Sequence, residues 1–208
     1  MEFSKCTLGY LEKNFGLVQK WDCRHLQEWL DMPMEITPKE ETELADLKYL
    51  LKMNVLHWNE QELALHFIGP IFNFARLTSV KYNLFAERFI AATVNGIELS
   101  GRPDGLLASG YREPEVPYFC FQEYKKERDP EGDPAAQCLA AMLVGQTLNN
   151  NTNKSMYGAY VIGRDWYFMT LNEKEYCISQ DFSAVTNDIS TILKALKSLK
   201  QIIEKRIS

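Results

Sequence analysis

The dipeptide Asn95-Gly96 limits the fold of this chain more than any other part of its 208 residues. Asn-Gly is the strongest local signal for a two-residue hairpin turn, because both positions of such a turn need positive φ. Residues 85–94 before it and residues 97–107 after it are rich in strand-forming side chains. A further aromatic run at residues 118–124 predicts a third strand. The middle of the chain is therefore expected to form three strands of a sheet.

Helices are predicted on both sides of these strands, from apolar residues at helical spacing. Before the strands they cover residues 7–32, as one helix or two short ones, residues 38–53 and residues 59–75. After the strands come a helix over residues 133–148, a second hairpin with strands at 157–162 and 166–171, and a helix over residues 182–207. This order predicts an α/β fold with a mixed central sheet flanked by helices.

Composition narrows the classes of function. The apolar content of 46% is enough for a sizeable core, and a net charge of -5 excludes a broadly basic surface, so any nucleic-acid contact must be local. Neither a G-x-G-x-x-G motif nor a P-loop occurs, and no stretch is long and apolar enough to predict a membrane span. We therefore expect neither a nucleotide-cofactor fold nor a membrane protein.

The cysteines are five in number, widely separated and without a Cys-x-x-Cys pair. This pattern fits reduced thiols better than a disulfide framework or a zinc ribbon. We therefore expect reduced cysteines and, with them, a cytoplasmic location. The five are Cys6, Cys23, Cys120, Cys138 and Cys177.

Two charged residues share one face of the predicted third strand. Side chains alternate along a strand, so Glu123 and Lys125 point the same way, with backbone positions about 7 Å apart. Asp104, near the middle or end of the preceding strand, is expected to lie beside Glu123 once the two strands pair. Two carboxylates suit Mg²⁺, which leaves its remaining positions to water and substrate phosphate. The pattern indicates a site that cleaves phosphodiesters, with Mn²⁺ able to replace Mg²⁺.

Pro103-Asp104, eighteen intervening residues and Glu123-Tyr124-Lys125 together match the motif of a known family. In this respect the chain resembles the PD-(D/E)XK nuclease superfamily, the fold class of many restriction endonucleases and RecB-like exonucleases. The resemblance spans about residues 59–171 and implies a restriction-endonuclease-like fold. Residues 1–58 are then a helical extension packed on the core, and residues 59–208 are the nuclease-like domain, including an amphipathic C-terminal helix.

The resemblance also implies a set of metal ligands. Asp104 and Glu123 bind Mg²⁺ through their carboxylates, with the backbone carbonyl of Tyr124 as a third ligand. Members of the superfamily often add an acidic residue from the helix before the first strand, and Glu62 or Glu60 matches that position. We expect Glu62 to complete the metal shell directly or through water.

The same resemblance assigns roles in catalysis and substrate binding. Lys125 orients the attacking water or stabilises the negative charge that develops on the phosphate. Gln137, on the helix after the motif, positions the lysine, the water or the phosphate through its amide. Arg102 and Lys126, which flank the motif residues, are expected to contact the substrate.

The expected function is hydrolysis of DNA by a Mg²⁺-dependent nuclease. One alternative is a non-catalytic scaffold or nucleic-acid-binding module with the same fold, and another is a metal-dependent hydrolase of small phosphorylated substrates. The chain is acidic and lacks an evident base-reading module, which indicates weak sequence selectivity or targeting by a partner protein. The C-terminal helix carries an apolar stripe that could pair with a second copy in a homodimer, while its basic face could track a phosphate backbone; the plain alternative is packing on its own sheet.

Several of these site residues could instead have a purely structural role. The run Pro103-Asp104-Gly105 is itself a turn signature, and Glu-x-Lys on a strand is commonly a solvated or cross-strand ion pair. Glu62 stands three residues after Asn59, where a capping box places a carboxylate. Gln137 lies where a helix often carries a solvated residue, and Arg102 could pair with an acid across the sheet. A site role and a structural role require different contacts of the same side chain, so the structure can distinguish between them.

Overall fold

The computed structural model describes residues 1–128 and 130–207, and within them eight strands form one mixed sheet. The strands are β1 (Val18–Gln19), β2 (Tyr82–Ala86), β5 (Gly105–Ser109), β6 (Glu115–Lys125), β7 (Met156–Ile162), β8 (Asp165–Asn172), β9 (Glu175–Ile178) and β10 (Phe182–Ser183). Their order is β1-β9-β8-β7-β6-β5-β2, with β10 paired to β8. The pairs β1–β9 and β6–β7 are parallel, and the other neighbours are antiparallel.

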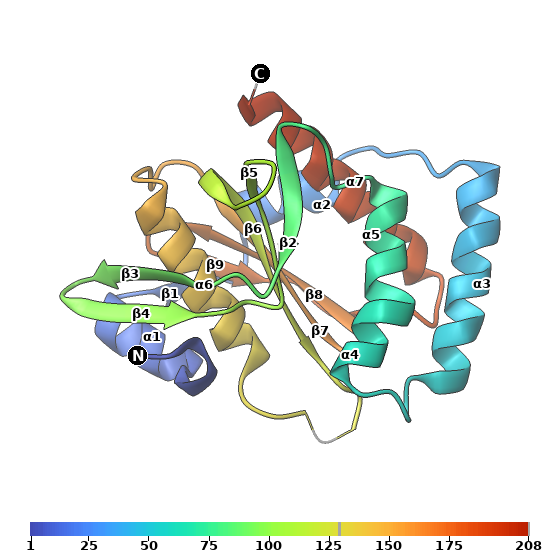
Figure 1. Ribbon diagram of the computed structural model, residues 1–208, viewed down its shortest axis with the longest axis horizontal. Helices are drawn as coiled ribbons and strands as arrows, with labels where there is room; N and C mark the ends of the chain where they lie inside the picture. Colours follow the sequence, from blue (N-terminus) through green and yellow to red (C-terminus); the bar gives the residue numbers. More distant parts are fainter. Residues whose placement is uncertain (129, 208) are drawn as a thin grey trace.

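Helices cover both faces of this sheet (Figure 1). One face carries η1 (Phe3–Lys5), α1 (Leu8–Phe15) and α6 (Pro134–Leu148). The other carries α2 (Arg24–Leu30), α3 (Pro38–Asn54), α4 (Glu60–Leu63), the π-helical segment η2 (Ala64–Ile68), α5 (Gly69–Ala75) and α7 (Asp188–Ile207). Successive strand residues supply the apolar layer beneath each group, as Leu106 packs on the α6 side and Leu107 on the α7 side. The predicted α/β fold with a mixed central sheet flanked by helices is confirmed.

Helix α6 connects the parallel strands β6 and β7 and is buried along nearly its whole length. Its sequence is apolar on all sides, which is typical of a helix inside a protein. Asp133 caps it, because its Oδ1 accepts a hydrogen bond from the backbone N–H of Ala136 at 2.9 Å, and Pro134 takes the first helical position. The helix predicted over residues 133–148 is confirmed.

The hairpin predicted at Asn95-Gly96 is present. Val94 lies opposite Ile97, and both turn residues have positive φ. The strands on either side of the turn are β3 (Ile90–Val94) and β4 (Ile97–Gly101). They form a separate two-stranded sheet, so the long arms expected from the sequence do not run on into the central sheet.

The interruption of both arms has a backbone cause. Residues 87–89 and 102–104 separate the hairpin from β2 and β5. Glu87 has a φ of 51°, and Pro103 has no N–H to donate to a strand ladder, so neither segment continues the pairing. Asp104 consequently lies at the break before β5 rather than within a strand.

Both ends of the chain add strands that the sequence did not predict. Residues 7–32, expected to form one helix or two short ones, form the two short helices α1 and α2, but β1 separates them and pairs with β9. Gly16, with a φ of 67°, ends α1 in the left-handed conformation. At the other end α7 begins at Asp188, after β9 and β10, rather than near residue 182. Residues 1–58, expected to be a helical extension, thus also supply a strand of the central sheet.

Helix α3, predicted over residues 38–53 and seen at the edge of the molecule in Figure 1, begins with a capping box. The Thr37 side chain accepts a hydrogen bond from the backbone N–H of Glu40, and Glu40 Oε2 accepts one from the backbone N–H of Thr37 at 2.8 Å. Glu40 also pairs with Lys197 of α7 at 3.0 Å. This ion pair attaches α3 to the helix that packs on the sheet.

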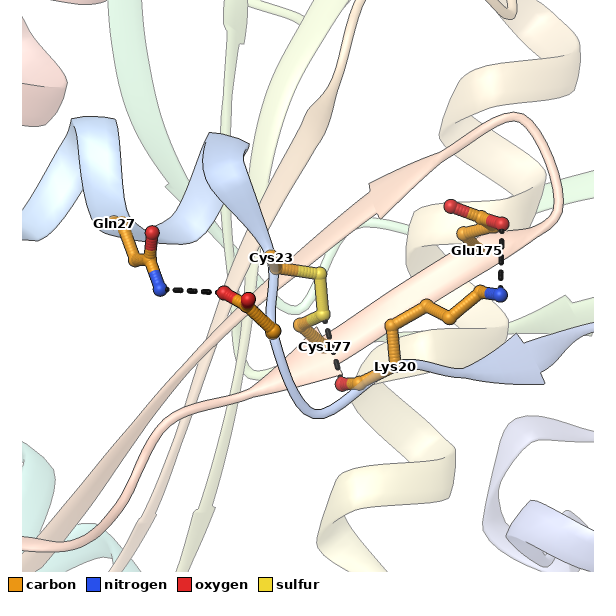
Figure 2. The surroundings of a disulfide bond; sticks show 6 residues. Lys20, Cys23, Gln27, Glu175 and Cys177 are labelled. Atoms are coloured by element: carbon orange, nitrogen blue, oxygen red, sulfur yellow. Dashed lines mark hydrogen bonds and ion pairs between the residues drawn. A yellow bond between two sulfur atoms is a disulfide. The ribbon is translucent and has the colours of Figure 1, made fainter.

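A disulfide joins Cys23 at the start of α2 to Cys177 in β9 (Figure 2). Their Cα atoms lie 6.2 Å apart, and an ion pair between Lys20 and Glu175 at 3.1 Å lies beside the bond. The prediction of reduced cysteines is wrong for this pair, because 154 positions separate the partners and only the fold brings them together. The free cysteines are all buried: Cys6, Cys120 and Cys138.

No helix in the described part of the chain is long and apolar enough to cross a membrane. The cytoplasmic location was argued from reduced cysteines, and the disulfide removes that argument. The location therefore stays a prediction.

Replacing Cys23 and Cys177 together by serine should lower the free energy of unfolding by about 3–5 kcal/mol, because the disulfide closes a long loop in the unfolded chain. Urea unfolding without reductant measures the difference. Dithiothreitol should destabilise the wild type by a similar amount and leave the double variant unchanged. A wild type that is equally stable with and without dithiothreitol would show that the bond does not form in solution.

Candidate active site

Asp104 is held against the end of β6. Its Oδ2 accepts a hydrogen bond from the backbone N–H of Tyr124 at 2.6 Å. Gly105, the next residue, pairs with Gln122 of β6, so the start of β5 brings Asp104 to this position. The carboxylate therefore bonds across to the neighbouring strand, whereas the turn alternative would have it cap its own loop.

Glu123 and Lys125 lie on the same face of β6, as their spacing predicts. Lys125 Nζ donates a hydrogen bond to Glu123 Oε1 at 2.8 Å, and both residues are more than 90% buried. Glu60, at the first position of α4, places its Oε1 4.0 Å from the same Nζ. One ammonium group thus lies near two carboxylates, of which Glu123 is buried and Glu60 is partly exposed.

Burial and like charge together shift the pKa values of the carboxylates. Burial, followed by repulsion from Asp104, raises the pKa of Glu123 to about 7. Burial also raises the pKa of Asp104, although the hydrogen bond from Tyr124 opposes the shift. For Lys125 burial disfavours the charge, but the hydrogen bond and the charge of Glu123 outweigh it, and the pKa is raised. The site therefore holds more negative charge than its lysine balances.

Cavities flank these residues on two sides. The larger, of about 520 Å³, is lined by Glu123 and Lys125 together with the base of the β3–β4 hairpin and the η1 segment. The smaller, of about 340 Å³, is lined by Asp104, Glu60 and Glu87. Asp104 and Glu123 are close enough for their charges to interact, yet they open onto neighbouring cavities.

Gln137 belongs to the larger cavity. It lies in the second turn of α6, and its side chain is buried to 7% exposure, so it is not a solvated surface residue. Gly132 passes so close to its amide that a Cβ at that position would collide with the Gln137 side chain. Gln137 lines the same cavity as Glu123 and Lys125, as its expected role beside the lysine requires.

Glu62 lies elsewhere. It is exposed and completes the capping box of α4: its Oε2 accepts a hydrogen bond from the backbone N–H of Asn59 at 2.8 Å, and Asn59 Oδ1 accepts one from the N–H of Glu62 at 2.9 Å. It lines neither of the two cavities. Glu60, two positions earlier, is the acidic residue of this helix that approaches Lys125. The resemblance matched both residues. Their different positions around the helix determine that Glu60, rather than Glu62, lies near Lys125 of β6.

The two further residues expected to bind substrate do not line the same cavity. Arg102 is exposed, lines the larger cavity and donates a hydrogen bond from Nη1 to the carbonyl of Glu87 at 2.9 Å. Lys126 is half-buried beside Glu60 and Glu131, away from that cavity. Glu87, whose φ is 51°, lines the smaller cavity together with Asp104 and Glu60.

Few side chains of the site are candidates for ligands of a hard divalent cation. Within residues 1–128 and 130–207, no three or more His, Cys, Asp or Glu side chains form a group that could hold a metal ion. Mg²⁺ commonly binds through one or two carboxylates while water and substrate phosphate fill the rest of its shell. Asp104 and Glu123 provide such a pair, and the surplus negative charge around Lys125 would be relieved by a cation.

Comparison with known proteins gives no indication of the function, which has to be inferred from the geometry of the site. No protein-family model matches the sequence, and no curated protein matches it either.

The free energy of unfolding of the metal-free protein should fall as the pH rises from about 5 to about 8. The folded pKa of Glu123, about 7, lies above its ordinary value of 4.5, so the unfolded chain releases this proton at lower pH and becomes relatively more stable. The Glu123→Gln variant should lack this part of the slope, worth roughly 2–3 kcal/mol. Lys125 adds no slope, because its raised pKa and its ordinary value of 10.5 both lie above this range.

Urea unfolding at several pH values, with chelator present, checks this expectation. Glu41→Gln, at an exposed position in the first turn of α3, is the matched control and should keep the wild-type slope. Identical slopes for the wild type and Glu123→Gln would contradict the raised pKa.

Proposed function

We propose that this protein is a metal-dependent nuclease that hydrolyses phosphodiester bonds of DNA with Mg²⁺ or Mn²⁺. The observation that carries the proposal is the placement of Asp104 on the backbone of β6, beside the hydrogen-bonded pair Glu123 and Lys125. Carboxylates that bind a hard cation and a neighbouring ammonium group are the parts that phosphodiester hydrolysis requires.

The order of elements supports a restriction-endonuclease-like fold of the PD-(D/E)XK type. Helices α4 and α5 precede β2, β5 and β6, which are antiparallel neighbours, and α6 then leads to β7, which is parallel to β6. The resemblance implied this succession of helix, three strands, helix and strand. The β3–β4 hairpin is an insertion between the first two of these strands.

Burial supports a functional role over a structural one. Placing one ammonium group and several carboxylates in a largely buried site costs desolvation energy, and an apolar cluster would be at least as stable. Strongly shifted pKa values in a cleft are typical of functional sites. Glu123, with a pKa raised to about 7, and Lys125 both line the larger cavity.

In this proposal each side chain has a defined task. Asp104 and Glu123, with the Tyr124 carbonyl, hold the cation. When bound, the cation lowers the pKa of a coordinated water and neutralises charge on the phosphate. Lys125, aligned by its hydrogen bond to Glu123, donates to the attacking water or to a phosphate oxygen. The Gln137 amide orients the same groups from α6.

Substitution of Asp104 by Asn should reduce cleavage of DNA to background, because the cation loses a charged ligand. Lys125→Met should lower the rate about 10²- to 10³-fold, as expected for removal of a group that stabilises transition-state charge. The assay uses labelled linear and circular DNA, single- and double-stranded, with Mg²⁺, with Mn²⁺ and with chelator.

Matched controls come from α3. Asp46→Asn and Lys52→Met remove the same charges at exposed positions and should leave cleavage unchanged. Cutting that survives both site substitutions would place the activity elsewhere. A well-folded wild type that cuts no DNA would favour the scaffold alternative. Hydrolysis of RNA or of mononucleotides alone would show that DNA is not the substrate.

Metal binding can be tested without turnover. Mn²⁺ at about 100 times its Kd should stabilise the fold by about 2.7 kcal/mol, and Asp104→Asn should abolish this gain. Thermal unfolding with Mn²⁺ and with chelator measures it, with Asp46→Asn as the control. A stabilisation that survives in Asp104→Asn would show that Mn²⁺ binds at another site.

A further inference from the structure

An exposed aromatic side chain lines the larger cavity of the candidate site. Phe89 lies in the break between β2 and β3 and is 59% exposed. It lines the same cavity of about 520 Å³ as Glu123 and Lys125. Among the exposed large apolar side chains in the described part of the chain, none besides Phe89 lines this cavity.

Arg102 covers this ring from the second break in the hairpin. Its guanidinium carbon lies 5.7 Å from the centre of the Phe89 ring, close enough for a cation–π contact. The hydrogen bond from Nη1 to the Glu87 carbonyl holds the group in place. Within residues 1–128 and 130–207 no ion pair engages Arg102, so its charge is available to a ligand.

The remaining wall of the cavity combines apolar and polar groups. Phe3 and Gly101 line it together with Glu2, Ser4 and Ser100, and the two serines carry hydroxyls that can donate or accept a hydrogen bond. A flat apolar ring, a planar cation and a few polar groups around one cavity are suited to a flat, polar-edged molecule joined to an anion. A nucleotide has this chemistry.

The ring face determines which state of the nucleic acid fits. In a duplex the faces of each base are covered by its stacked neighbours, and proteins read only the edges in the grooves. Aromatic side chains engage base faces in single strands, at ends and in flipped nucleotides. Phe89 can therefore stack only on a base with an uncovered face, in a single strand, at an end or flipped out of the duplex.

Resting on the nuclease function proposed above, we propose that this cavity binds an unstacked nucleotide of the substrate, with its base on Phe89 and its phosphate at Arg102. The strand is then single-stranded, or locally opened, next to the bond that is cut. Phe89 and Arg102 determine this preference, while Asp104, Glu123 and Lys125 carry out the hydrolysis.

Binding in the presence of chelator tests the proposal without cleavage. The probes are a fluorescein-labelled oligothymidine strand and a blunt-ended duplex hairpin of similar length, followed by fluorescence anisotropy with the full-length protein. The wild type should bind the single strand more tightly. Phe89→Ala should weaken that binding about 5- to 150-fold, the range for loss of one stacked base, and change duplex binding little.

Conservative and distant variants separate stacking from general damage. Phe89→Trp should restore binding, and its indole fluorescence should be quenched by the oligothymidine. Tyr111→Ala removes an aromatic side chain that is 71% exposed outside the cavity, and it should bind as the wild type does. Arg102→Gln should lower the salt slope of log K for the single strand by about 0.7, the value of one phosphate contact.

The outcomes distinguish this inference from the proposed function. Equal binding of single strand and duplex, no binding of either, or unchanged binding by Phe89→Ala would each overturn it, even if the protein cuts DNA. Conversely, single-strand binding that depends on Phe89 in a protein that never cuts would sustain the binding site and reject the nuclease.

Discussion

The hydrogen bond from the backbone N–H of Tyr124 to Asp104 is the contact on which the arrangement of the site depends. This hydrogen bond joins Asp104, in the break between β4 and β5, to the backbone near the end of β6. The β3–β4 hairpin lies outside the central sheet, and residues at its base line the larger cavity together with Glu123 and Lys125 of β6. The same carboxylate that holds the break is the one proposed to bind the cation.

The charges of the site conflict with the stability of the metal-free protein. Lys125 balances Glu123 directly and Glu60 at longer range, while burial and, after it, repulsion from Asp104 raise the pKa of Glu123. A fold selected for stability alone would not keep these groups buried together. A divalent cation and a phosphate, bound together, would balance the charge, which links the electrostatics to the proposed reaction.

Local signals predicted a large part of the fold. The Asn95-Gly96 turn and the helices over residues 38–53 and 133–148, which begin at the caps of Thr37 and Asp133, depend on contacts within a few residues, and each is found as expected. The short strands β1, β9 and β10 were missed, because two to four residues carry no readable pattern and gain their stability from distant partners. The disulfide was missed for the same reason.

The sequence by itself determined that Glu123 and Lys125 share a face, because alternation along a strand is a property of the local backbone. It also placed Gln137 on the helix that follows. Only the tertiary structure decided that Glu60 rather than Glu62 approaches the lysine, and that Asp104 and Phe89 lie at breaks beside the cavities. These relations depend on how helix and hairpin pack against β6, and packing between segments far apart in the chain is not encoded in any local pattern.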